Sequence, residues 1–126
     1  MLVGFGLIAV LVVFIGAVGV VGAAAATYAR AATAADAAAL ASAPVTFRPF
    51  GARGSPRQEA SRFARINGTR LVSCSCPVNR AWIERTVSVT VARTITLPLV
   101  GEITVTATSR AVFDPTRLLP DGSGVP

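Results

Sequence analysis

The chain begins with an apolar stretch much longer than an element of a small soluble domain requires. Residues 1–29 contain no charged side chain, and residues 2–26 are almost entirely Leu, Val, Ile, Phe, Gly and Ala. A helix of about 20 apolar residues crosses a hydrocarbon core about 30 Å thick. A soluble chain of this size cannot cover such a helix on every side, so the pattern predicts a transmembrane helix and not a core helix.

The helical pattern continues past the predicted membrane segment. Alanine dominates residues 23–42, and neither Gly nor Pro interrupts the chain there until Pro44. Because alanine is the best helix former, we expect one helix about 60 Å long, ending near Ser42, with its last third in water. Tyr28 and Arg30 mark the interface, as aromatic rings and snorkelling cations do. The first unit is therefore residues 1–43.

Composition changes at Pro44, and residues 44–57 form a linker rich in Pro, Gly and Arg. Residues 58–66 then predict a short amphipathic helix that ends at Asn67-Gly68, because both residues tolerate a left-handed cap. Its apolar side combines Ala60, Phe63, Ala64 and Ile66.

The apolar period changes to two after that cap. Residues 71–74, 82–96 and 102–113 predict three strands, the last two joined by a hairpin at residues 97–101. The predicted fold class is α+β: a long transmembrane helix that extends out of the membrane, then a short helix on a small three-stranded antiparallel sheet. This domain covers residues 58–114, its core drawing on Phe63 and Ile66, with the projecting helix available to complete it. Residues 115–126 are predicted to be a disordered tail.

Small residues follow one another along the long helix at spacings that allow close contact with another helix. An alanine-rich composition typical of GC-rich genomes is the alternative explanation. The predicted helix-packing residues are Gly16, Gly19, Gly22, Ala25, Ala29 and Ala32.

Residues suited to catalysis are few. The chain has no His, and its twelve basic residues are all arginine, against six scattered acids. No paired carboxylates, phosphate loop or dinucleotide motif is present, so we expect no enzyme, no catalytic residue, no cofactor and no small-molecule substrate. The arginines are spread singly, with almost no aromatic residue interleaved to stack bases, which argues against specific nucleic-acid binding despite a net charge of +6.

Cys74 and Cys76 are the only cysteines. In a regular strand their Cα atoms would be about 6.6 Å apart, near the upper limit for a disulfide. A strained internal bond, eased if Pro77 bends the chain, a bond to a partner chain, or two free thiols are all compatible with the sequence. A zinc site is not expected, because two thiols without a histidine supply too few ligands.

A cleaved signal peptide is the alternative to a permanent membrane helix. Ala41-Ser42-Ala43 has the small-x-small pattern of a cleavage site. Against it, no basic residue precedes the apolar run, the run is too long, and Pro44 would follow the cut.

Several segments together resemble a known family. They are Tyr28-Ala29-Arg30, the alanine-rich segment that contains Asp36 and Leu40, the Asn67-Gly68 helix end, and the strand with Leu71 and Cys74. This arrangement is similar to that of the TadE-like, pilin-like proteins of bacterial tight-adherence (Flp-type, type IVb) pilus systems. The corresponding family-motif residues are Asp36, Leu40, Asn67 and Gly68.

The resemblance implies a minor pilin or a pilus or secretion assembly component that acts by helix packing. Its partners would be the lipid bilayer and other pilin-like or Tad assembly proteins. It would be a single-pass protein of the cytoplasmic membrane with an extracytoplasmic C-terminal domain. A secreted or membrane-anchored small binding module with a cleaved signal peptide is the alternative function.

Two family features differ in this chain. Relatives usually begin with a basic leader ending in Gly, with a Glu shortly after the cut, whereas residues 1–6 carry no basic residue and the first acid is Asp36. Relatives also tend to have a cysteine ahead of the short helix, and residues 56–62 contain none. Near the membrane segment only Arg30 and Asp36 carry charge, and they cancel, so the positive-inside rule does not decide the orientation.

Overall fold

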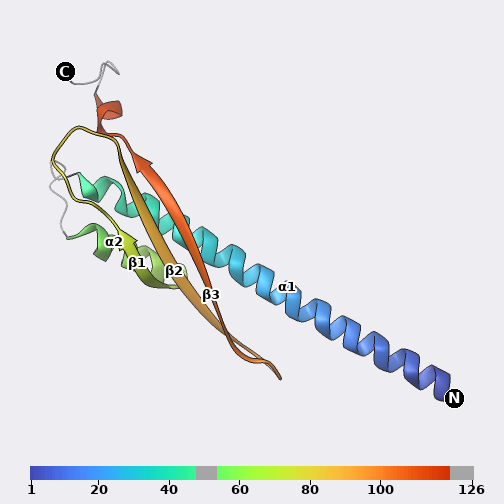
Figure 1. The fold of residues 1–126 in the computed structure, drawn as a ribbon. Helices are drawn as coiled ribbons and strands as arrows, with labels where there is room; N and C mark the ends of the chain where they lie inside the picture. Colours follow the sequence, from blue (N-terminus) through green and yellow to red (C-terminus); the bar gives the residue numbers. More distant parts are fainter. Residues whose placement is uncertain (48–53, 120–126) are drawn as a thin grey trace.

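The structure is a computed structural model that describes residues 1–47 and 54–119 (Figure 1). One long helix, one short helix and a three-stranded antiparallel sheet make up an α+β fold, as the sequence pattern predicts. Two single-turn 3₁₀ helices follow the long helix and the last strand. The elements are α1 (Leu2–Ser42), η1 (Pro44–Thr46), α2 (Pro56–Ile66), β1 (Arg70–Ser75), β2 (Arg85–Leu97), β3 (Gly101–Phe113) and η3 (Pro115–Leu118).

Helix α1 is continuous over 41 residues, and its two halves have different surroundings. Residues 3–22 are exposed along their whole length, whereas one face is buried from Thr27 onward. Figure 1 shows the N-terminal half extending well beyond the sheet. Among the described residues, this is the one helix long and apolar enough to cross a membrane, and its most apolar window has no buried residue. This apolar half is therefore not buried as the core helix of a soluble domain would be.

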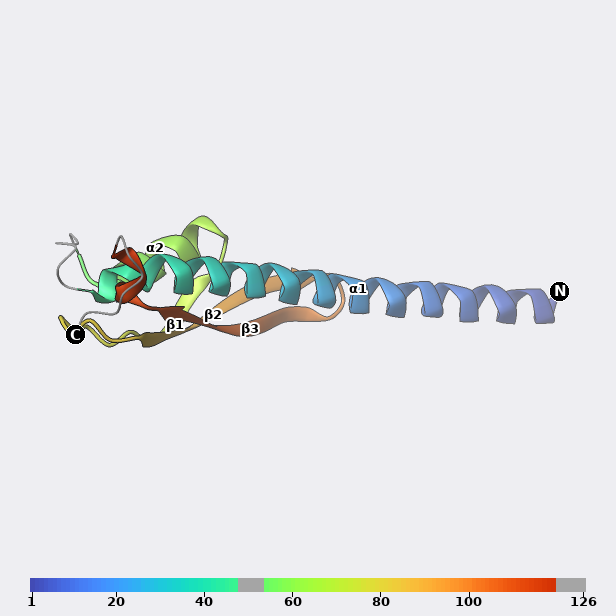
Figure 2. The ribbon, with the colours of Figure 1, turned by 90° about the horizontal axis from the view of Figure 1, so that it is seen from above.

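The domain has two layers. The C-terminal half of α1 and helix α2 form one layer, and the three-stranded sheet forms the other (Figure 2). Both helices lie on the same face of the sheet (Figure 2), with α1 against β2 and β3 and α2 against β1. The strand order is β1-β2-β3, and β2 pairs with β3 without interruption from Arg85 opposite Phe113 to Leu97 opposite Gly101. Strand β1 is short and irregular between Leu71 and Ser73. The β2–β3 hairpin is therefore the longest arm of the sheet.

Small side chains form the core between the two layers. Because alanine has only a methyl group, the helix axis approaches the sheet closely, and β-branched valines fill the space from the strands. An alanine-rich helix in water is thus explained by the sheet that covers it. The central core residues, all 0% exposed, are Ala31, Ala34, Ala35, Ala38, Ala39, Ala60, Ala64, Val87, Val89 and Val91.

Helix α2 begins two residues earlier than the sequence pattern predicts. Ser55 and Gln58 form a capping box: the Ser55 N–H donates to Gln58 Oε1 over 2.9 Å, and the Gln58 N–H donates to Ser55 Oγ over 3.2 Å. Pro56 occupies the first turn, where its missing N–H costs nothing. The predicted end at Asn67-Gly68 is confirmed, since Gly68 takes a left-handed φ of 71°.

Two predictions about the packing are wrong. Ile66 is 67% exposed and lies outside the core, because Ala60 and Ala64 define the buried side of α2 and Ile66 is two residues, about 200°, further round the helix. Strand β2 starts at Arg85 and not at Trp82, whose ring instead packs edge-on against Phe47 with centroids 4.9 Å apart.

The predicted disordered tail is wrong for its first residues. Residues 115–118 form η3, in which Pro115 is buried and Asp114 Oδ1 accepts a 3.0 Å hydrogen bond from the Thr116 N–H. In the predicted linker, residues 44–46 form η1 and Phe47 is buried beside it. Residues 48–53 of that linker and 120–126 of the tail lie outside the described residues.

Replacing Ala38 by Leu tests the close contact between α1 and the sheet. Ala38 is fully buried, so the added bulk should overpack the core and lower the free energy of unfolding by about 1–3 kcal/mol. Ala26→Leu makes the same change at an exposed position of the same helix and should have little effect. Denaturant unfolding of the detergent-solubilised protein, followed by Trp82 fluorescence, measures both. Equal stabilities of the two variants would contradict this description of the core.

Candidate functional site: the uncovered surface of α1

Most of the predicted helix-packing residues lie on the uncovered surface of α1. A Cβ atom added at Gly16, Gly19 or Gly22 would meet nothing within 4 Å, and Ala25 and Ala29 are exposed. Ala32 differs, because it is half-buried and packs against the core of the same chain. Five of the six predicted residues are therefore accessible to a second helix.

The surface that packs on the sheet is a different one. Thr27, Ala31 and Ala38 follow one another at helical spacing and are all buried. Ala29 lies two residues, about 200°, away from Ala31 around the helix axis and faces solvent. The helix thus keeps one side for its own sheet and exposes small residues on another.

Two shallow depressions lie along α1. The first is within the N-terminal half and is lined only by apolar residues, namely Ala9, Val10, Val13, Phe14 and Ala17. A surface of this kind suits lipid chains or the side chains of another helix.

The second depression lies where α1 meets the end of α2. Ala29, Arg30, Thr33, Asn67 and Arg93 line it, and Arg93 Nη1 donates a long 3.5 Å hydrogen bond to the Gly68 carbonyl. Arg30 on α1 and Arg93 on β2 give this end of the domain a positive charge.

Three of the four residues on which the predicted family resemblance depends make contacts within the chain. Asp36 accepts a hydrogen bond from Ser109 Oγ on β3. Asn67 Nδ2 donates to the Phe63 carbonyl over 2.8 Å. A side chain at Gly68 would be strained by the left-handed φ of 71° and would displace the Arg93 guanidinium, whose Nη1 lies 2.9 Å from the position of an added Cβ. Leu40, in contrast, is 67% exposed. The Asn67-Gly68 pair thus ends α2, and Asp36 ties α1 to the sheet.

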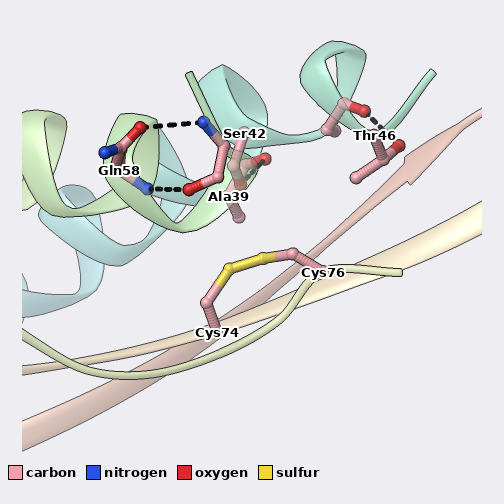
Figure 3. The surroundings of a disulfide bond; sticks show 8 residues. Ala39, Ser42, Thr46, Gln58, Cys74 and Cys76 are labelled. Carbon is pink, nitrogen blue, oxygen red and sulfur yellow. Dashed lines mark hydrogen bonds between the residues drawn. A yellow bond between two sulfur atoms is a disulfide. The ribbon is translucent and has the colours of Figure 1, made fainter. Parts of the chain in front are cut away.

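Cys74 and Cys76 form a disulfide with each other (Figure 3). Their Cα atoms are 5.4 Å apart, within the range that a disulfide accepts and shorter than a regular strand would place them. Strand β1 ends at Ser75, so the chain is no longer extended across the pair. Both residues are half-buried and pack against the core beneath the C-terminal end of α1. Of the alternatives compatible with the sequence, the structure contains the internal bond.

Sequence reasoning missed Arg85, which it did not distinguish from the other singly spread arginines. Arg85 is only 7% exposed, and its guanidinium donates to the carbonyl oxygens of Thr46 (3.0 Å) and Asn79 (2.9 Å). It also donates to the carbonyls of Ala81 and Ile83, and it lies over the Phe47 ring at 5.4 Å.

This arginine holds the far end of the domain together. Thr46 follows α1, whereas Asn79 and Ala81 belong to the loop before β2, so one side chain joins segments distant in sequence. The rigid fork of guanidinium donors can satisfy several carbonyls at once. A single Arg at a strand start carries no sequence signal of this role, because the carbonyls that it binds belong to loops.

A metal site has no support in the part of the chain that the structure describes, where no three His, Cys, Asp or Glu side chains come together. No protein-family model, curated protein or solved structure gives a significant match to this chain. The interpretation of the site therefore depends on its own geometry.

Replacing both Cys74 and Cys76 by Ser tests the disulfide. The bond closes a very short loop, so its loss should lower the free energy of unfolding by about 1–2 kcal/mol without unfolding the domain. Dithiothreitol treatment of the unmodified protein should match the double variant, and should leave the variant unchanged. Thiol titration and non-reducing gels complete the measurement. Two free thiols, or a crosslinked dimer, in the oxidised protein would rule out the internal bond.

Proposed function

We propose that this protein is a minor pilin or assembly component of a Tad-like pilus or secretion system. It acts as a single-pass membrane protein that packs its long helix against other helices, without catalysis. Support comes from the resemblance described above and from an architecture in which one helix serves as both membrane anchor and domain core.

The observation that carries the proposal is the continuity of α1 from its bare apolar half into the core. Residues 3–22 are exposed, which at 1.5 Å per residue gives about 30 Å, enough for a hydrocarbon core. Farther along the same helix, Ala31, Ala35 and Ala39 are fully buried under the sheet. A lateral contact made by the anchor is thus transmitted rigidly to the domain.

The same observation weighs against the alternative of a cleaved signal peptide. A cut after Ala43 would remove every buried alanine of α1 and leave β2 and β3 without the helix that covers them. Exposing that face costs roughly 25 cal/mol per Å² of apolar surface, a serious loss for a domain this small. A secreted binding module derived from this chain would lack six of the thirteen buried residues of the described core cluster and the helix that covers β2 and β3.

Gly19→Leu tests whether the bare face mediates assembly. The new side chain meets nothing within this chain, so folding and insertion should be retained, whereas close approach of another helix should be blocked. We expect normal abundance in the membrane fraction of the native host, together with loss of co-purifying pilus or secretion components.

Val21→Leu is the matched control, because Val21 is 68% exposed, is already bulky, and lies two residues, about 200°, around the helix axis from Gly19. It should retain the partners. If both variants behave like the unmodified protein, α1 is only an anchor and the assembly proposal is wrong.

Topology provides an independent test of the proposal. Alkaline phosphatase fused after Leu119, beyond the end of β3, should be active, because the proposed function requires an extracytoplasmic domain. A fluorescent protein that matures only in the cytoplasm, fused at the same position, should be dark. The reverse pattern would exclude a pilin-like role.

A further inference from the structure

The turn of the β2–β3 hairpin has an unusual composition for an exposed loop. Its residues are Leu97, Pro98, Leu99 and Val100; Leu99 is 108% exposed and Val100 53% exposed. Turns at the end of exposed hairpins usually consist of Gly, Asn, Asp and Ser, since these residues suit both the backbone and water. Four consecutive apolar residues at the tip of the longest arm therefore require another explanation.

The backbone of the turn makes Leu99 still less expected. The Val100 N–H bonds to the Leu97 carbonyl, with Pro98 and Leu99 at the two central positions. Leu99 has a φ of 70°, and a positive φ at the second central position normally selects Gly or Asn. A leucine here accepts backbone strain and full exposure together, so local stability does not account for it.

The hairpin directs this turn toward the apolar half of α1. In both views the β2–β3 arm runs along α1 in the direction of its N-terminus and extends farther than α2 or β1 (Figures 1 and 2). Where α1 begins to be covered, Ala23 and Ala24 are half-buried, and Thr27 is buried. The turn thus lies near the level at which the bare, membrane-spanning half of α1 emerges.

The charged residues near the hairpin turn and near the start of the uncovered half of α1 are distributed as at a membrane surface. Arg30 and Arg93 line the depression on the domain side, whereas the chain carries no charge in residues 1–29 or 94–101. Glu102 lies two residues after the turn and is exposed, so its carboxylate restricts penetration to the turn and Gly101. Basic residues just above an apolar insertion are typical of membrane interfaces.

We propose that the Leu97–Val100 turn inserts into the interfacial layer of the same phospholipid bilayer that α1 spans. The domain would then contact the membrane at two points, the helix and the hairpin turn. Interfacial insertion buries apolar groups about 5–10 Å into the boundary between headgroups and acyl chains. The inference rests on membrane anchoring by α1, and is independent of any pilus partner.

The test places a single tryptophan in the turn of the full-length chain. Trp82, the only native tryptophan, is replaced by Phe, and Leu99→Trp or Val100→Trp supplies the probe. Val112→Trp is the matched control, since Val112 is also exposed but lies near the opposite end of β3. Each variant is reconstituted into phosphatidylcholine–phosphatidylglycerol vesicles that contain lipids brominated at shallow acyl positions.

We expect the turn probes to be quenched by the brominated lipids, to emit at shorter wavelength, and to be several-fold less accessible to iodide than the probe at residue 112. Turn probes that behave like the control in both quenching experiments would overturn the proposal. Two turn positions are used so that a folding defect in one variant does not decide the result.

Two further measurements separate the competing explanations. The turn probe could instead be protected from iodide by a second copy of the chain. In that case the protection would disappear when the protein in the vesicles is diluted with additional lipid, and brominated lipid would not quench the probe; this result would also overturn the proposal. Extraction of the chain by alkaline carbonate would show that α1 does not anchor it, which removes the premise of both this inference and the proposed function.

A polar replacement then tests the cause of insertion. Leu99→Asn suits the positive φ, so the turn should be retained. In the Val100→Trp chain this change should lower quenching by brominated lipid several-fold without lowering the thermal midpoint. Unchanged quenching at residue 100 would show that the apolar turn does not hold the hairpin at the bilayer.

Discussion

The close contact between the alanine face of α1 and the sheet is the constraint on which the rest of the molecule depends. The strands provide only a thin valine layer, and α2 covers β1 alone, so most of the sheet's inner face has no other cover. Since methyl side chains on the helix let the two layers approach, a small domain obtains a continuous core. One continuous helix consequently joins the domain to the apolar N-terminal half of α1.

This constraint also explains how one helix presents two surfaces. Alanine at the buried positions is required by packing, whereas Gly19 and Ala29, on the remaining surface, are not required by anything within the chain. Small residues on a lipid-facing surface gain little from lipid contact but allow backbones to approach each other. Their presence outside the core is therefore the part of the composition that the fold itself does not explain.

The sequence was informative where local periodicity and side-chain chemistry act alone. Helix α1, the alternation in β2 and β3, and the Asn67-Gly68 helix end follow from propensity and φ preferences of individual residues. The burial of Arg85 and the exposure of Ile66 do not, because they depend on carbonyls and neighbours brought together by the fold. The disulfide was left open for the same reason: whether Cys74 reaches Cys76 depends on where β1 ends.

A second membrane contact would change what α1 can do in the bilayer. A single spanning helix can tilt in any direction, and its domain follows, so its small-residue face would meet neighbours at a variable angle. The hairpin turn lies to one side of the helix axis (Figure 1), and its insertion would favour tilts that bring the sheet side toward the membrane. The domain would thus restrict the tilt of its own anchor. Close helix packing tolerates few crossing angles. A restricted tilt would therefore hold the surface that carries Gly16, Gly19 and Gly22 at a suitable angle before a partner helix binds.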